Sequence, residues 1–133
     1  MEILALDVGS RRVGIARADS LARLPEPLKT VKTKEAIPQL QAMIKENNVE
    51  AIVIGLPRNL SGEDTPQTGW VRNWASRAKA QLDIPLYWQD EALSTKVAET
   101  RHRDSKDQHV DALAAVVILQ DFLVAAKEAR VLV

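Results

Sequence analysis

The sequence predicts one α/β domain built on a mixed β-sheet, and three observations support this class. The chain has 133 residues, enough for one hydrophobic core and too few for two. Residues 2–7 and 51–57 have the character of strands that are apolar on both faces, as strands in the middle of a covered sheet are. Helical patterns separate the later strands, so those strands should be parallel and joined by right-handed crossovers.

Five strands are expected from apolar or alternating segments bounded by turn residues. They span residues 2–7, 13–18, 28–32, 51–57 and 85–91. The first two should form a hairpin whose turn uses the backbone freedom of Gly9, and the third should lie at a sheet edge. We therefore expect three antiparallel strands first and parallel β-α-β units after them.

Helices are expected where apolar residues recur every three or four positions. They span residues 34–48, 66–82 and 110–126, and Ser94 is placed to cap a further short helix. Residues 110–126 are apolar nearly all round, a pattern typical of a buried helix. The order of elements is thus three strands, a helix, a strand, a helix, a strand and two helices.

Composition limits the classes of partner. The chain has 18 basic and 18 acidic residues, so no global field draws it to nucleic acid or to an anionic membrane, and any such binding needs a local patch. It has no cysteine, which excludes disulfides and thiolate metal sites and fits a reducing compartment. The opening apolar run is too short for a signal peptide or a membrane span. We expect a cytoplasmic protein without membrane contact.

Acidic residues stand at the ends of predicted elements. Asp7 ends the first strand, Asp90 and Glu91 end the last strand, and Asp111 begins the long apolar helix, where the helix dipole tolerates negative charge. Ligands of parallel sheets bind outside the carboxyl ends of the strands, so these carboxylates should converge there. Carboxylates that lie close together repel one another unless a hard cation such as Mg²⁺ or Mn²⁺ lies between them. Two such ions about 4 Å apart can promote phosphodiester hydrolysis, so the pattern predicts a metal-dependent phosphoryl-transfer site.

Four blocks of sequence resemble one known family. The first, "LALDVGSRRVGIARAD", resembles the DxGxxxxGxA opening of the YqgF/RuvX family of Holliday junction resolvase-like nucleases, which have an RNase H fold. The likeness continues through "VIGLPRNLSGEDTPQT", "DEALST" and "VDALAAVVILQDFL", in order and over essentially the whole chain. Members of this family are implicated in maturation of the 5′ end of the small-subunit ribosomal RNA precursor.

The resemblance implies a fold and a catalytic set. The fold is an RNase H-like three-layer α/β/α domain over residues 1–133, with a mixed five-stranded sheet. Asp7, Glu91 and Asp111 would be the catalytic acids that bind the metal, and the resemblance selects Glu91 over Asp90. Strand alternation agrees with this selection, since neighbouring residues point to opposite faces.

Substrate contacts are expected from polar and basic residues near the same edge of the sheet. They are Arg11, Arg12, Arg58, Asn59, Ser94, Thr95, Arg101 and Arg103. Three features depart from the family pattern: Ala92 stands where arginine is common, "RHRDSKDQH" replaces a segment usually rich in glycine and lysine, and His109 within it stands where lysine is common. These departures remove basic charge, so they predict weak binding to bare nucleic acid.

The predicted function is that of a metal-dependent endonuclease acting on structured nucleic acid, in 5′-end processing of pre-16S rRNA. Its cofactor would be Mg²⁺ or Mn²⁺, its partners the rRNA precursor and the pre-ribosomal particle, and its state a monomer or weak homodimer. Cleavage of branched DNA and a non-catalytic role in RNA binding and ribosome assembly stay open. The "DVGS" turn also resembles the phosphate-binding motif of actin-like sugar kinases, but those proteins need two such domains around the nucleotide.

Overall fold

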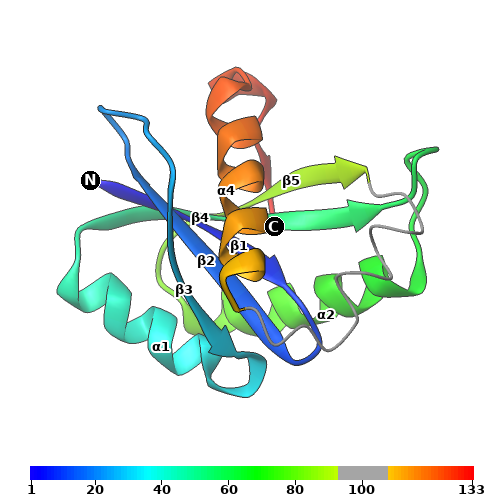
Figure 1. The fold of residues 1–133 in the computed structure, drawn as a ribbon, viewed down its shortest axis with the longest axis horizontal. Coiled ribbons are helices and arrows are strands. Elements are labelled where there is room, and N and C mark those ends of the chain that lie inside the picture. The colour runs from blue at the N-terminus through cyan, green and yellow to red at the C-terminus, as the bar shows by residue number, and fades with distance from the viewer. Residues whose placement is uncertain (93–107) are drawn as a thin grey trace.

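A computed structural model of the protein describes residues 1–92 and 108–133 (Figure 1). Its strands are β1 (Glu2–Val8), β2 (Arg12–Asp19), β3 (Glu26–Lys32), β4 (Val49–Arg58), β5 (Leu86–Ala92) and β6 (Val131–Leu132). Its helices are α1 (Thr33–Glu46), α2 (Pro66–Gln81), α4 (Gln108–Val124) and the 3-10 turn η1 (Lys127–Ala129). The short helix expected at Ser94 lies outside the described residues.

The strands form one mixed sheet in the order β3-β2-β1-β4-β5-β6. β1 is antiparallel to β2, β2 is antiparallel to β3, and β1, β4 and β5 run parallel as neighbours. These pairings confirm the predicted antiparallel start and the parallel units after it. The carboxyl ends of β1, β4 and β5 therefore meet at one edge of the sheet.

The described residues contribute six strands to the sheet, whereas five were predicted. The additional strand, β6, has two residues and pairs with Tyr87 and Trp88 of β5. A strand of two residues has no alternation that a sequence pattern could reveal. It forms because the chain turns back through η1 to the free edge of β5.

Helices cover both faces of the sheet and make three layers. Side chains of α1 and α2, such as Leu40 and Trp74, share one apolar cluster with Leu4 and Leu6 of β1. Residues of α4 form a second cluster with the alternate side chains of the strands, among them Ile3. Figure 1 shows α4 crossing the strands on the side toward the viewer. Both faces of β1 are buried, as its apolar sequence predicted.

The helix α4 is buried on only one side, which corrects the expectation that it would be enclosed. Ile118, Leu119 and Phe122 are fully buried against the sheet. On its outer side, Val110, Leu113, Val117 and Val124 are 44–86% exposed. The reason is its place in an outer layer, where the described residues cover one face of the helix. No helix in the described ranges is long and apolar enough to cross a membrane.

Two glycines let α4 lie close to the sheet. A Cβ atom on Gly14 of β2 would overlap the backbone carbonyl of Asp111, and one on Gly55 of β4 would meet the side chain of Ile118. The backbone of Asp111 cannot move aside as the flexible side chain of Ile118 can. The first turn of α4 can therefore lie directly on β2 only because Gly14 has no side chain.

Candidate functional site

Asp7 lies near the carboxyl end of β1 on the face that α4 covers. Ile3 and Ala5 of the same strand belong to the apolar cluster of α4, and strand alternation puts Asp7 on their side. Its partner across the antiparallel pair is Gly14 of β2. Because the backbone of Asp111 lies directly on Gly14, the strand pairing brings Asp7 and Asp111 to the same corner of the sheet.

Asp111 is in the first turn of α4 and pairs with a cation supplied by β2. The Nε atom of Arg12 lies 3.2 Å from its Oδ2 atom. The side chains of Arg12 and Asp111 are only 21% and 15% exposed, so this ion pair is largely shielded from water. A negative charge at this helix position is also favoured by the helix dipole.

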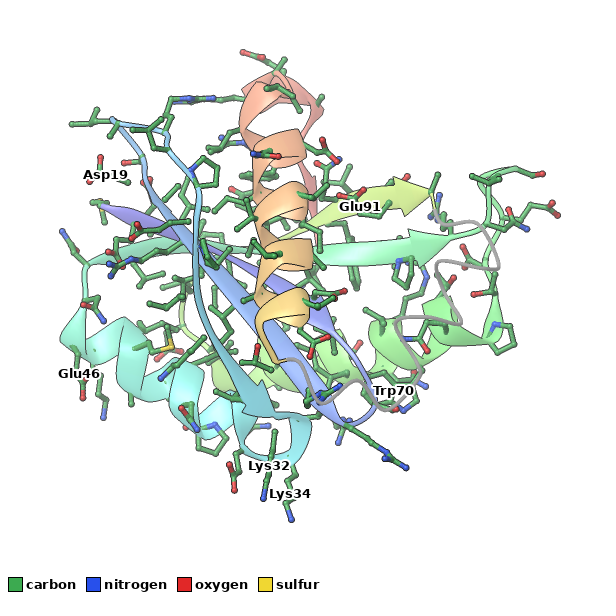
Figure 2. The ribbon with its side chains drawn as sticks, viewed as in Figure 1. Asp19, Lys32, Lys34, Glu46, Trp70 and Glu91 are labelled. Atoms are coloured by element: carbon green, nitrogen blue, oxygen red, sulfur yellow. The ribbon has the colours of Figure 1, made fainter. Side chains whose placement is uncertain are left out.

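Glu91 lies at the carboxyl end of β5, also on the α4 face. Tyr87 of the same strand packs against the α4 cluster. Glu91 is four residues further along β5, so its side chain lies on the same face as that of Tyr87. Asp90 has the other orientation, since Trp88, two residues before it on β5, packs against the apolar cluster of α1 and α2. The Oδ2 atom of Asp90 lies 3.4 Å from a terminal nitrogen of Arg58. Figure 2 shows Glu91 on β5. The two neighbouring acids thus point to opposite faces, as predicted.

The three acids share one face and one edge, but their backbones are not adjacent. β4 lies between β1 and β5, so about 10 Å of sheet separates Asp7 from Glu91. Residues 1–92 and 108–133 contain no group of three acidic or histidine side chains placed to hold a metal ion. Convergence of Asp7, Glu91 and Asp111 on shared ions therefore stays a prediction, which depends on side-chain reach.

The donor chemistry of this edge fits a hard divalent ion. Carboxylate oxygens are the ligands that Mg²⁺ and Mn²⁺ prefer, and all three acids offer them from one face of the sheet. Asp111 already holds a cation, because the guanidinium of Arg12 contacts its Oδ2 atom. The Asp111 carboxylate is thus already compensated by one positive charge, that of Arg12. A divalent ion bound there would compensate the same carboxylate.

Arg58 lies on the opposite face from the acids. Its Nε atom is 3.2 Å from Oδ1 of Asp64, in addition to its contact with Asp90. Asp64 also pairs with Arg72 of α2 at 3.3 Å, so two arginines share one carboxylate. A phosphate that binds Arg58 must therefore compete with two carboxylates at the end of β4.

Asn59 organises the loop that follows β4. Its side-chain oxygen accepts hydrogen bonds from the backbone N–H groups of Ser61 at 3.0 Å and Glu63 at 2.9 Å. Gly62 has a φ of +76°, a conformation that glycine adopts without strain. The side-chain oxygen of Asn59 thus stabilises the turn of this loop.

Two threonines anchor this loop, and their pairing is not among the features predicted from the sequence. Thr65 and Thr68 form a reciprocal capping box at the start of α2. The Thr68 hydroxyl also donates to the carbonyl of Pro57 in β4. The sequence does carry a signal for this capping box. It is a threonine followed, three residues later, by a residue whose side chain can accept a hydrogen bond from the backbone N–H of that threonine.

The remaining predicted substrate residues lie in two places. Arg11 is exposed in the turn between β1 and β2, and its carbonyl accepts the backbone N–H of Thr33 at 2.9 Å. The Thr33 hydroxyl donates to the carbonyl of Gly9 at 2.7 Å, so two hydrogen bonds from the first residue of α1 hold this turn in place. The other residues are outside the described ranges: Ser94, Thr95, Arg101 and Arg103.

Comparison with solved structures identifies the fold. RuvC of T. thermophilus in complex with a Holliday junction substrate superimposes with a TM-score of 0.60 at 15% sequence identity, and the match covers 100% of this chain and 99% of that chain. At this identity the likeness concerns the fold alone. The protein therefore has the RNase H-like α/β fold of RuvC.

Sequence relatives cover nearly the whole chain. A protein of Roseiflexus sp. (strain RS-1), named "Putative pre-16S rRNA nuclease", is 35% identical over 130 residues, which are 91% of this chain and 92% of the relative. A protein of Chloroflexus aurantiacus with the same name is 37% identical over 130 residues, 91% of this chain and 85% of the relative.

A family model, described as "RuvX: Holliday junction resolvase", matches residues 1–125. That range includes β1 with Asp7, β5 with Glu91 and the start of α4 with Asp111. The expected family is thus confirmed by matches over nearly the full length, and the chain belongs to the RuvX family.

Proposed function

We propose that this chain is a metal-dependent endonuclease that hydrolyses phosphodiester bonds in structured nucleic acid, in 5′-end processing of the 16S rRNA precursor. The observation that carries the proposal is the placement of Asp7, Glu91 and Asp111. They come from three distant parts of a RuvX-family chain and share the α4 face at the carboxyl edge of the parallel strands. The names of the relatives support the class of substrate.

In this proposal Asp7, Glu91 and Asp111 hold Mg²⁺ or Mn²⁺. The bound ions would activate water for attack on phosphorus and stabilise the leaving oxygen. The protein's own contribution is positional. Gly14 lets the first turn of α4 approach Asp7, and the partly buried Arg12 keeps positive charge beside Asp111.

Substrate binding is assigned to the loops around this edge. Arg11 and Arg12 would contact phosphates from the β1–β2 turn, and Arg58 and Asn59 would do so from the end of β4. Four further contacts are proposed from the part of the chain outside the described residues: Ser94, Thr95, Arg101 and Arg103. Phosphate contacts of this kind fix the register of a nucleic acid without reading its sequence.

We further propose that residues 1–133 form a single nuclease domain that acts in the cytoplasm as a monomer or weak homodimer. The zero net charge supports a partner that supplies additional contacts. We propose the pre-ribosomal particle as that partner.

The proposal is tested by incubating the purified protein with a pre-16S rRNA fragment, single-stranded DNA and a four-way DNA junction in parallel. We expect cleavage of the RNA in Mg²⁺ or Mn²⁺ and none in EDTA. The Asp7→Asn and Asp111→Asn variants serve as controls for contaminating nuclease. Binding of RNA without cleavage under every metal condition would instead indicate a non-catalytic assembly factor.

Resolution of branched DNA is the second candidate function. The description of the family model and the RuvC-like fold favour it. A site that hydrolyses phosphodiesters acts on either polymer, and recognition of shape and of the 2′-hydroxyl separates RNA from DNA. Faster cleavage of the four-way junction than of the RNA would replace rRNA processing with this function.

A further inference from the structure

The ion pair between Arg12 and Asp111 has a geometry set by the backbone. Arg12 is two residues before Gly14 on β2, so both lie on the α4 face of that strand. The carbonyl of Asp111 lies on Gly14, which holds the first turn of α4 beside Arg12. A surface ion pair usually joins two flexible side chains. Here the two side chains come from backbone segments that pack directly against each other.

The local environment makes a cation at Asp111 necessary. Its side chain is 15% exposed, and a shielded carboxylate without a counter-charge is unfavourable. Asp7 adds a second negative charge at the same corner of the sheet, since it pairs with Gly14. Arg12 meets this requirement with a contact of 3.2 Å to the Oδ2 atom.

A guanidinium and a divalent ion would compete for that carboxylate. Both are positive, and both would use oxygen lone pairs of Asp111 at the same corner. We propose that Arg12 is a positioning residue that holds Asp111 before metal binds and is displaced from its Oδ2 atom by the divalent ion. The inference rests on the proposed metal-dependent function. It adds an exchange of cations, which leaves the Arg12 guanidinium at the edge where substrate phosphate would lie.

The first test is calorimetric titration of Mn²⁺ into the wild-type protein and its variants. Arg12→Gln removes the competing charge, so we expect Mn²⁺ binding about three- to tenfold tighter, in line with the loss of one partly shielded ion pair. The metal-free Arg12→Gln protein should also melt at a lower temperature than wild type. Arg12→Lys keeps the charge and should restore an affinity close to that of wild type.

Two control variants make the result specific. Arg17 is also an ion-paired arginine of β2, bonded to Glu26 at 2.7 Å, but it lies at the far end of the strand. Arg17→Gln should leave Mn²⁺ affinity unchanged. Asp111→Asn combined with Arg12→Gln should abolish the gain in affinity, because the released carboxylate is then absent.

The second test uses the wild-type protein and does not depend on a variant that folds. The Nε–H resonance of Arg12, assigned through bonds from its own backbone amide, should shift during titration with Mg²⁺, while that of Arg17 stays in place. An Arg12→Gln protein that binds Mn²⁺ no tighter than wild type, or an Arg12 resonance unmoved at saturating Mg²⁺, overturns the exchange. Failure of both proteins to bind Mn²⁺ would reject the metal centre itself, a result distinct from equal binding.

Discussion

The corner of the sheet where Asp7 and Asp111 meet depends on a residue without a side chain. Gly14 pairs with Asp7 across the strands and supports the backbone of Asp111 from below. Arg12, on the same face, supplies the positive charge. At the scale of single residues, close backbone packing thus fixes the positions of Asp7 and Asp111 relative to each other, while Glu91 comes from β5, two strands away.

Replacing any of the three acids with its amide should abolish nuclease activity. For Asp7→Asn, Glu91→Gln and Asp111→Asn we expect single-turnover cleavage to fall by more than about 100-fold, since even the loss of an outer partner of a metal site costs up to about that factor. Asp7→Asn and Glu91→Gln conserve shape and remove like charge, so they should keep or raise the melting temperature, whereas Asp111→Asn loses the ion pair with Arg12 and should lower it. Asp121→Asn, on the same helix as Asp111, should cleave like wild type. Full activity of any of the three variants would remove that acid from the catalytic set.

A methyl group at position 14 should separate α4 from the sheet. Gly14→Ala would overlap the carbonyl of Asp111, and overpacking of this kind costs about 1–3 kcal/mol in the free energy of unfolding. Gly69→Ala is the matched control. Its Cβ would meet nothing within 4 Å, and alanine stabilises a helix interior by up to about 1 kcal/mol. Urea denaturation measures both, and an undiminished stability of Gly14→Ala would show that α4 can shift.

At the scale of elements, β4 and the loop after it form a braced unit on the face away from the acids. Arg58 pairs with Asp64 and Asp90, and Thr68 of α2 donates to the carbonyl of Pro57. This bracing fixes the direction in which the chain leaves the sheet. It also holds Arg58 in place without burying it, since 28% of its side chain is exposed.

Removing Arg58 should weaken nucleic-acid binding in a salt-dependent way. If Arg58 contacts one phosphate, Arg58→Ala should reduce the slope of log affinity against log salt by about 1, with a similar loss on every sequence. Fluorescence anisotropy with an RNA oligonucleotide over a salt series measures this slope. Arg77→Ala, on the exposed side of α2, should leave it unchanged. An unaltered slope for Arg58→Ala would assign Arg58 to the loop alone.

Sequence patterns predicted the elements with strong periodicity and missed those set by tertiary contact. β1, β4 and β5 were predictable from their apolar runs, and each predicted end lies one residue before the observed end at Val8, Arg58 or Ala92. β6 was not, since it exists only by pairing with Tyr87 and Trp88. Within the site, strand alternation was enough to predict that Asp90 and Glu91 point to opposite faces. The contact between Gly14 and α4 was not predictable, because it depends on a helix nearly 100 residues further along the chain.

At the scale of the whole molecule, charge balance governs how the protein meets nucleic acid. The net charge is zero, and four of the described arginines are paired with carboxylates: Arg12, Arg17, Arg58 and Arg72. This pairing lowers the number of cations available to release counterions from a polyanion. Bare RNA should therefore bind weakly, and binding should decline steeply as salt is added.

An arginine restored at position 92 should increase RNA binding. Register places Ala92 beside Arg58 and on its face, so the new guanidinium would extend that basic position and contact a phosphate there. We expect Ala92→Arg to increase affinity at low salt and to steepen the salt slope by about 1. Ala92→Gln is the control for side-chain size. No gain at any salt concentration would place the substrate away from this end of β5.

The short strand β6 has a consequence for association between molecules. Its two residues cover Tyr87 and Trp88 at the edge of β5, and Val133 adds a backbone hydrogen bond of 2.9 Å to Leu86. The family match ends at residue 125, so this cover lies beyond the matched part of the chain. An uncovered row of backbone donors and acceptors is a template on which another strand can add. β6 therefore occupies part of the edge of β5 on which a strand of another molecule could otherwise add, so disrupting β6 is expected to promote self-association without altering the acids.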